Sequence, residues 1–242
     1  LPSMDAIMRV LEAIQQGVSL LAYEFFSEKA LAKVTKHHPV QRPFTNISPF
    51  YALLEFERLD ESVENIVLSK IEEAMNKGWV VDAVISQSNE QSRKLWQLRE
   101  LISETLAQWV PYKNDISSKV SKVPDLLNRI DEVVNRRYPD FEVVWYGHIG
   151  DGNLHLNILK PNNLNVVDFE NQCNVVSEEI FNVISDLGGS VSAEHGVGAL
   201  KAPFLHYTRS LAEISIMEGI KKVLDPDRIM NPGKIFTSQS FK

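Results

Sequence analysis

The amino-acid sequence predicts an α+β fold, in which helices cover one side of a mainly antiparallel sheet and a helical tail follows. Strand-like and helix-like patterns alternate along most of the 242 residues. Between two apolar runs stands Asp151-Gly152, a preferred pair for a two-residue hairpin turn. Because such a turn joins antiparallel neighbours, a purely parallel sheet is disfavoured, and we expect a ferredoxin-like arrangement.

Seven segments are predicted to be helices, because apolar residues recur at the helical spacing between capping residues and glycine or proline stops. They are residues 4–14, 28–36, 63–77, 88–109, 124–137, 169–187 and 210–224. Ser88 with Gln91 and Ser210 with Glu213 have the spacing of capping boxes.

Six segments are predicted to be strands, because they are short, apolar and bounded by turn residues. They are residues 18–26, 49–57, 79–86, 111–120, 143–146 and 154–159. We expect an α+β domain over residues 1–190 and a C-terminal helical segment over residues 191–242, which completes the site described next.

The hairpin around Asp151-Gly152 carries two histidines. Counting outward from that turn pairs His148 with His155, whose Cβ atoms would then lie roughly 4.5 to 5.5 Å apart on one face of the sheet. Two imidazoles at that separation can share one metal ion. Asn157 points to the same face, because side chains alternate along a strand.

A third metal ligand has to come from elsewhere in the chain. The run Ser192-Ala-Glu-His-Gly-Val-Gly198 offers Glu194 or His195. Imidazole and carboxylate together suit zinc, iron, manganese or cobalt, and the residue types alone do not choose among these metals.

Composition limits the classes of partner and compartment. The net charge of −7 argues against nucleic acid or an anionic membrane, both of which select basic surfaces. The single cysteine, Cys173, forms no disulfide within the chain and indicates a reducing compartment. No apolar run approaches the roughly 18 to 20 residues that span a bilayer, and the amino terminus has no signal-peptide pattern.

Four motifs resemble those of a known family. They are the runs 147–157 and 192–198, Asp225-Pro226, and Asn231-Pro-Gly-Lys234. Together they resemble the C-terminal substrate (cap) domain of FAD-linked oxidases of the vanillyl-alcohol oxidase type. The likeness is strongest to D-2-hydroxyglutarate dehydrogenases, followed by D-lactate dehydrogenases, and it spans nearly the whole chain.

The resemblance implies a metal centre and a catalytic base. The metal, commonly zinc or manganese, would be held by His148, His155 and Glu194, and His195 would be the base. A metal bound to the substrate lowers the pKa of its hydroxyl, so that a neutral His195 can take the proton while the C2 hydride passes to a flavin.

The resemblance also implies four substrate-binding residues. Arg99 and Lys113 would bind the substrate carboxylate, and Asn157 would add a polar contact. Ser103 stands at a position that is threonine in the closest relatives, and it keeps the hydroxyl. The implied substrate is a small D-2-hydroxy acid of the D-2-hydroxyglutarate or D-lactate type.

The implied cofactor is FAD, bound mainly by an N-terminal domain that this chain lacks. The sequence has no glycine-rich loop between a strand and a helix that would hold a pyrophosphate. Asn231 and Lys234 are expected to approach the flavin from this side. Because the chain begins with Leu1 rather than Met, we expect a fragment that is inactive in isolation.

Two other functions stay open at this point. A His-His-Glu set can also activate water in a metal-dependent hydrolase, and a noncatalytic ferredoxin-like module could use the glycines for turns alone. The expected electron acceptor of the parent enzyme is a quinone or an electron-transfer protein, and a homodimer is left open. The expected location is the cytoplasm, or the mitochondrial matrix in a eukaryote.

Overall fold

The structure, a computed structural model, describes residues 1–58 and 60–237. Within these residues the fold centres on a five-stranded sheet in the order β2-β1-β4-β5-β3, and every neighbouring pair is antiparallel. The strands are β1 (Leu20–Ser27), β2 (Phe50–Phe56), β3 (Tyr112–Ser117), β4 (Glu142–Gly147) and β5 (Asn153–Leu159). The predicted α+β class is therefore confirmed.

The half of the sheet that carries the histidines is a split β-α-β unit. Strands β3 and β4 are parallel to each other, because each is antiparallel to β5, which lies between them. The short turn η2 (Val120–Lys122) leads from β3 into helix α6 (Val123–Arg137), which crosses back to β4.

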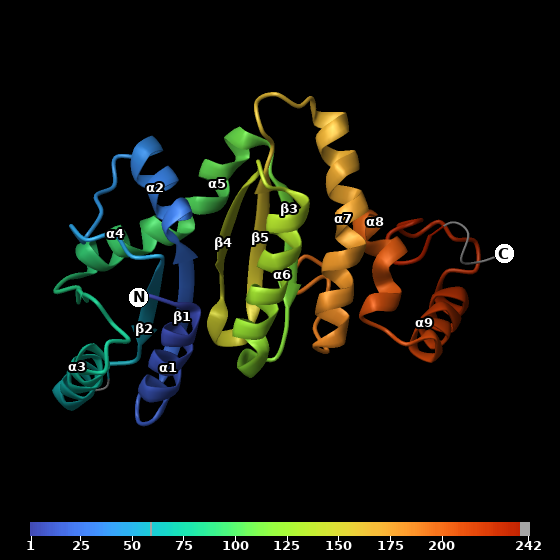
Figure 1. The fold of residues 1–242 in the computed structure, drawn as a ribbon. Coiled ribbons are helices and arrows are strands. Elements are labelled where there is room, and N and C mark those ends of the chain that lie inside the picture. The colour runs from blue at the N-terminus through green and yellow to red at the C-terminus, as the bar shows by residue number, and fades with distance from the viewer. Residues whose placement is uncertain (59, 238–242) are drawn as a thin grey trace.

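One face of the sheet is covered by long helices (Figure 1). These are α1 (Met4–Gln15), α6 and α7 (Val166–Asp186), with α3 (Glu61–Asn76) packed beside α1. Phe25, Trp145 and Leu156 of the strands are buried beneath them in the larger apolar core. Ser3 caps α1 through a hydrogen bond from the amide of Ala6.

The other face carries helices as well, so the prediction that helices cover one side only is wrong. Helices α2 (Glu28–His37), α4 (Asn89–Glu100) and α5 (Ile102–Leu106) and the turn η1 (Ala107–Trp109) form a second, smaller core with β1 and β4. They cover only part of that face. On this second face, β3 and β5 carry Asp115, His155 and Asn157 in place of apolar residues.

Two predicted elements differ in the structure. Residues 79–86 connect α3 to α4 without joining the sheet, and Val81 and Val84 are 50% and 51% exposed. Apolar alternation is not sufficient for a strand, which also needs a neighbouring strand for its backbone groups. The long helix expected over residues 88–109 is divided into α4, α5 and η1 at Leu101.

The C-terminal segment is helical, as predicted. It contains α8 (Gly198–Lys201), η4 (Ala202–Tyr207) and α9 (Leu211–Leu224), and the capping box of Ser210 and Glu213 is present. A bridge between Ser117 and Ser190 joins the residue just before this segment to the sheet. Helix α9 buries none of its residues in the described chain. The division of the chain at residue 190 stays a prediction.

Helix α7 is long and amphipathic rather than apolar all round. Cys173 lies on its buried face as a free thiol. Among the described residues, no helix combines the length and the apolar composition that crossing a membrane requires.

Candidate metal centre and active site

The hairpin between β4 and β5 is longer than the sequence predicted. Strand β4 ends at Gly147 and β5 begins at Asn153, with the 3-10 turn η3 (Ile149–Asp151) between them. In the resulting register His155 lies opposite Tyr146, so the predicted pairing of His148 with His155 is wrong.

Backbone contacts explain this longer turn. The carbonyl of His148 accepts hydrogen bonds from the amides of both Asp151 and Asn153. Gly152 has a φ of +72°, and a Cβ there would lie 2.1 Å from the carbonyl oxygen of Ser118. Gly152 is therefore needed for its close approach to the chain after β3.

The two imidazoles meet despite the shifted register. Their ring centroids are 5.5 Å apart and their planes are nearly perpendicular, at 83°. His155 projects from within strand β5, whereas His148 lies at the start of the loop and approaches the ring of His155 from there. The loop thus brings the two imidazoles together, which direct cross-strand pairing was expected to do.

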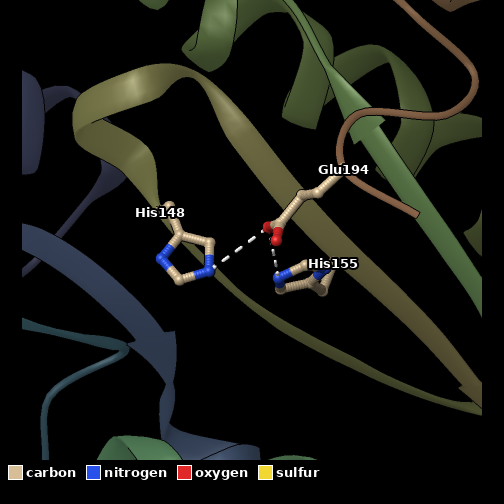
Figure 2. A group of neighbouring side chains, drawn as sticks. All are labelled: His148, His155 and Glu194. Carbon is tan, nitrogen blue, oxygen red and sulfur yellow. Dashed lines mark ion pairs between the residues drawn. The ribbon is translucent and has the colours of Figure 1, made fainter. Parts of the chain in front are cut away.

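Glu194 is brought to these rings by the segment that follows α7. Its Oε1 lies 3.3 Å from Nε2 of His148 and 3.7 Å from Nε2 of His155. Figure 2 shows the Glu194 carboxylate pointing toward both rings. The side-chain amide of Asn153 also donates a hydrogen bond to Oε1 of Glu194. One ligand atom from each of the three residues lies within 4.8 Å of the others.

These separations fit a shared divalent ion. Nitrogen and oxygen ligands about 2.0 to 2.1 Å from a tetrahedral ion are roughly 3.3 Å apart, close to the two contacts of Glu194. A cavity of about 410 Å³ opens beside the group and is lined by Ser117, His148, Asp151, Asn153, Ala193 and Glu194. Two imidazoles and a carboxylate next to an open cavity have the residue types and the open side of a metal site that keeps one position free.

Each imidazole also contacts a buried carboxylate on its other side. Oε1 of Glu24, on β1, lies 2.7 Å from Nδ1 of His148. Oδ1 of Asp115, on β3, lies 3.5 Å from Nδ1 of His155. The side chains of Glu24 and Asp115 are both 5% exposed.

The environments of the two rings shift their pKa values in opposite directions. The hydrogen bond to Glu24 raises the pKa of His148 above its ordinary value. Burial lowers the pKa of His155 to about 4, and the charge of Arg99 adds to this effect. His155 is therefore neutral at pH 7 and able to bind a metal without losing a proton.

His195 lies beside the three-residue group rather than in it. Its ring is roughly parallel to that of His155, with centroids 6.1 Å apart, and its side chain is 63% exposed. Its backbone amide donates a hydrogen bond to Oδ2 of Asp115 at 2.9 Å. An exposed imidazole next to the ligand group can reach a substrate, and its role as the base stays a prediction.

Arg99 lies close to both histidines although it comes from α4. Its Nε is 2.9 Å from Oε2 of Glu24, and its guanidinium lies over the ring of Tyr146, 4.7 Å from the centroid. The ring of Tyr146 in turn is 4.8 Å from that of His155. Within the described residues Nη2 of Arg99 is buried without a hydrogen-bond partner, so this donor remains for another group.

Lys113 and Asn157 lie opposite each other on β3 and β5, two residues beyond the Asp115–His155 pair. Nζ of Lys113 donates a hydrogen bond to Oγ of Ser103 at 3.3 Å, so the hydroxyl and the ammonium are neighbours. Asn157 is buried, and its Oδ1 has no hydrogen-bond partner in the described chain. None of these side chains lines the 410 Å³ cavity, which lies toward the other end of β5.

The structure does not bring the two predicted flavin contacts to the metal group. Asn231 and Lys234 are exposed in the segment after α9. Among the described residues, no hydrogen bond or ion pair joins either one to His148, His155 or Glu194.

Sequence reasoning missed four residues of this site: Glu24, Asp115, Tyr146 and Asn153. One signal could have indicated the first two. Glu24 stands within the apolar strand Leu20–Ser27, and Asp115 is two residues after Lys113 in a strand whose next residue, Ile116, is buried. A carboxylate at an inward strand position is costly unless it has partners, and such positions often serve a site.

Comparisons with known proteins agree with this picture. The family described as FAD linked oxidases, C-terminal domain, matches residues 1–235. The D-2-hydroxyglutarate dehydrogenase of Stutzerimonas stutzeri (strain A1501) is 53% identical over 98% of this chain and 51% of its own length. That of Xanthomonas citri pv. viticola is 46% identical over 98% of this chain and 50% of its own length.

Two further matches also cover nearly all of this chain and about half of the matched protein. A putative mitochondrial D-lactate dehydrogenase of Schizosaccharomyces pombe is 33% identical over 96% of this chain and 46% of its own length. The solved structure of 4-ethylphenol oxidase from Gulosibacter chungangensis, in its isoeugenol complex, has the same fold with a TM-score of 0.60. It is 13% identical and covers 99% of this chain and 53% of its own.

The chain spans about half the length of the curated relatives it matches. With a family match over residues 1–235 and relatives at these identities, the chain belongs to the family of FAD-linked oxidase C-terminal domains.

Proposed function

We propose that this chain is the substrate- and metal-binding part of an FAD-dependent dehydrogenase that oxidises a D-2-hydroxy acid to the 2-oxo acid. The proposal rests on one observation. The His148–His155–Glu194 group and the cations Arg99 and Lys113 lie on the same face of the sheet. A 2-hydroxy acid presents a hydroxyl and an adjacent carboxylate, which need an electrophile and cations close together.

The two histidines and Glu194 would hold a divalent ion, zinc or manganese. The ion would supply Lewis acidity, which lowers the pKa of the substrate's C2 hydroxyl. Asn153 holds the Glu194 carboxylate in place through its amide, so that residue orients a ligand without taking part in the chemistry.

His195 would accept the proton of the C2 hydroxyl. Its exposed ring lies next to His155, at the edge of the ligand group, where a substrate bound at the ion would be within its reach. The backbone amides of Glu194 and His195 both donate hydrogen bonds to Oδ2 of Asp115, which holds this segment against β3. Proton transfer of this kind requires a neutral imidazole.

Arg99, Lys113, Ser103 and Asn157 would bind the polar groups of the substrate. Arg99 is the stronger candidate for a carboxylate, because its buried guanidinium keeps a donor without a partner in the described chain. Two separate cations suit a substrate with two carboxylates. This favours D-2-hydroxyglutarate over D-lactate, in keeping with the names of the relatives that are 53% and 46% identical.

FAD would accept the hydride and would be bound mainly by the part of the enzyme outside this chain, with Asn231 and Lys234 contributing from this side. The electrons would then pass to a quinone or to an electron-transfer protein.

The first experiment tests the metal. The 242-residue chain, loaded with zinc or manganese and dialysed, is expected to retain about one ion per chain, as measured by elemental analysis. His148→Ala and His155→Ala should each lose it, whereas His206→Ala, which changes an exposed histidine of η4, should not. Equal metal content in all four proteins would refute the ligand set.

The second experiment tests the substrate. In calorimetric titrations the metal-loaded chain should bind D-2-hydroxyglutarate more tightly than its L enantiomer, and removing the metal should weaken this binding. A protein extended toward the amino terminus should retain flavin and reduce an artificial electron acceptor with the D acid. A colourless extended protein that cleaves esters or phosphates would support a hydrolase instead.

A further inference from the structure

The two histidines of the metal group have the same arrangement of neighbours. Each directs Nε2 toward Oε1 of Glu194, at 3.3 Å and 3.7 Å. Each directs Nδ1 toward a carboxylate, Glu24 for His148 and Asp115 for His155. The two carboxylates come from the strands on either side of the hairpin, β1 and β3.

Glu24 and Asp115 lie on the far side of the rings from Glu194, so they are not ligands of the same ion. Both are buried, and each has a further partner that fixes its direction. Oε2 of Glu24 is in ion-pair contact with Nε of Arg99 at 2.9 Å, without a well-aligned hydrogen bond. Oδ2 of Asp115 accepts hydrogen bonds from the amides of Glu194 and His195 at 2.8 and 2.9 Å.

The second oxygen of Asp115 is left for His155. At 3.5 Å from Nδ1 it is at ion-pair distance, and it has no hydrogen-bond partner in the described part of the chain. The carbonyl of Asp115 also accepts a hydrogen bond from the amide of Ala193. Asp115 therefore binds three successive backbone amides of the segment that delivers Glu194, in addition to facing His155.

We propose that Glu24 and Asp115 are positioning residues, which hold His148 and His155 with the ring proton on Nδ1 and so present both Nε2 atoms to one divalent ion. This proposal rests on the function proposed above. A neutral imidazole has one donor and one acceptor nitrogen, and a carboxylate only accepts. Nε2 of each ring also faces a carboxylate, that of Glu194, but at the longer distance, and it needs its lone pair to bind an ion there. The proton is therefore expected on Nδ1, which makes the shorter contact, 2.7 Å to Glu24 and 3.5 Å to Asp115.

Replacing each carboxylate by its amide tests this directly. In Asp115→Asn the amide oxygen is needed by the backbone amides of Glu194 and His195, so the NH2 group faces Nδ1 of His155. In Glu24→Gln the oxygen is needed by Arg99, so the NH2 group faces Nδ1 of His148. An NH2 group requires an acceptor, which moves the ring proton to Nε2 and blocks metal binding there.

The first measurement is the tautomer of each histidine in the metal-free chain, from ¹⁵N-labelled imidazole NMR at pH 8.5. In the wild type both rings are expected to carry the proton on Nδ1. Asp115→Asn should move it to Nε2 on His155 and leave His148 unchanged, and Glu24→Gln should do the reverse. Each variant is thus the control for the other, since a general loss of structure would disturb both rings.

The second measurement is zinc and manganese affinity by calorimetry. Each variant should bind the metal roughly 10- to 100-fold more weakly than the wild type, the usual effect of removing a partner that orients a ligand. Asp140→Asn, which changes an exposed carboxylate between α6 and β4, should bind as the wild type does.

The possible outcomes separate this proposal from the function it rests on. If both variants keep the wild-type tautomers, or bind metal as tightly as the wild type, the positioning role is overturned. If the tautomers switch as expected but the wild type binds no metal, the positioning role stands and the metal centre of the proposed function fails. If one variant does not fold, the other still decides the matter for its own ring.

Discussion

Arg99 and Glu24 form a buried ion pair between α4 and β1, with Nε 2.9 Å from Oε2 and side chains that are 9% and 5% exposed. The pair holds a guanidinium at the candidate site while leaving its Nη2 without a hydrogen-bond partner in the described chain. Burying such a pair costs solvation, which structures recover through close contacts and further hydrogen bonds. A substrate carboxylate would supply the bond that Nη2 lacks.

Arg99→Lys is therefore expected to weaken the binding of D-2-hydroxyglutarate to the metal-loaded chain. An ammonium cannot contact Glu24 and a substrate carboxylate with the same planar fork. Losing one charge-assisted hydrogen bond, worth about 1.5 to 3 kcal/mol, corresponds to a roughly 10- to 100-fold higher Kd by calorimetry. Arg93→Lys, on the exposed face of the same helix, is the matched control. An equal loss in both variants would argue against substrate contact by Arg99.

Metal affinity should depend on pH mainly through His148. A histidine must be neutral to bind a metal, and the pKa of His148 is raised by Glu24, whereas burial lowers that of His155 to about 4. Affinity should thus fall as pH drops from 8 toward 6, with about one proton released per ion bound. Calorimetry in buffers of different ionisation enthalpy measures this number. Glu24→Gln removes the main cause of the raised pKa of His148 and should move this fall in affinity to lower pH. Two protons released per ion at pH 6 would contradict the expectation.

Lys201 should make the chain more stable as pH rises. Burial lowers the pKa of Lys201 to about 8 from its ordinary value of 10.5, so between these pH values the unfolded chain binds a proton that the folded chain has lost. Stability then rises with pH, because the unfolded state binds more protons. Its Nζ donates a hydrogen bond to Oδ1 of Asn114 and lies over the ring of Phe181.

The measurement is urea unfolding of the wild type and Lys201→Met from pH 8 to 9.5. The wild type should gain about 1 to 2 kcal/mol relative to the variant over this range, since one pKa unit corresponds to about 1.4 kcal/mol. Lys222→Met, on the exposed surface of α9, should follow the wild type. A constant difference across the range would show that Lys201 titrates normally.

Gly152→Ala should destabilise both the hairpin and the metal group. Its φ of +72° is unfavourable for alanine, and the added Cβ would collide with the carbonyl of Ser118. Gly188→Ala is the matched control, because its φ is +66° and no atom lies within 4 Å of the added Cβ. The control should cost about 1 to 2 kcal/mol of unfolding free energy from backbone strain alone.

Gly152→Ala is expected to cost more than this control and, unlike it, to lower metal affinity, since the loop that carries His148 must move. Thermal or urea unfolding and metal titration measure the two effects. Equal unfolding free energies for the two variants would contradict the close contact with Ser118.

The secondary structure could largely be predicted because its signals are local. Caps such as Ser3 and Ser210, and the helical spacing of apolar residues, act within one or two turns. The prediction of a strand over residues 79–86 was wrong, because a strand needs a neighbouring strand to pair with, and local apolar alternation does not supply one. The predicted register of the β4–β5 hairpin was wrong for a similar reason. The turn depends on the contact of Gly152 with Ser118, which lies far from it in the sequence.

The sequence by itself determined the antiparallel α+β fold and, through its motifs, singled out His148, His155 and Glu194 as candidate ligands, because turn pairs, periodicity and motifs are properties of short stretches. Only the tertiary structure decided which groups surround those residues. Glu24 lies 124 positions from His148 along the chain, and pairing within one sheet brings them to 2.7 Å. Strand order and helix packing set such contacts, and these depend on how the whole chain buries its apolar surface.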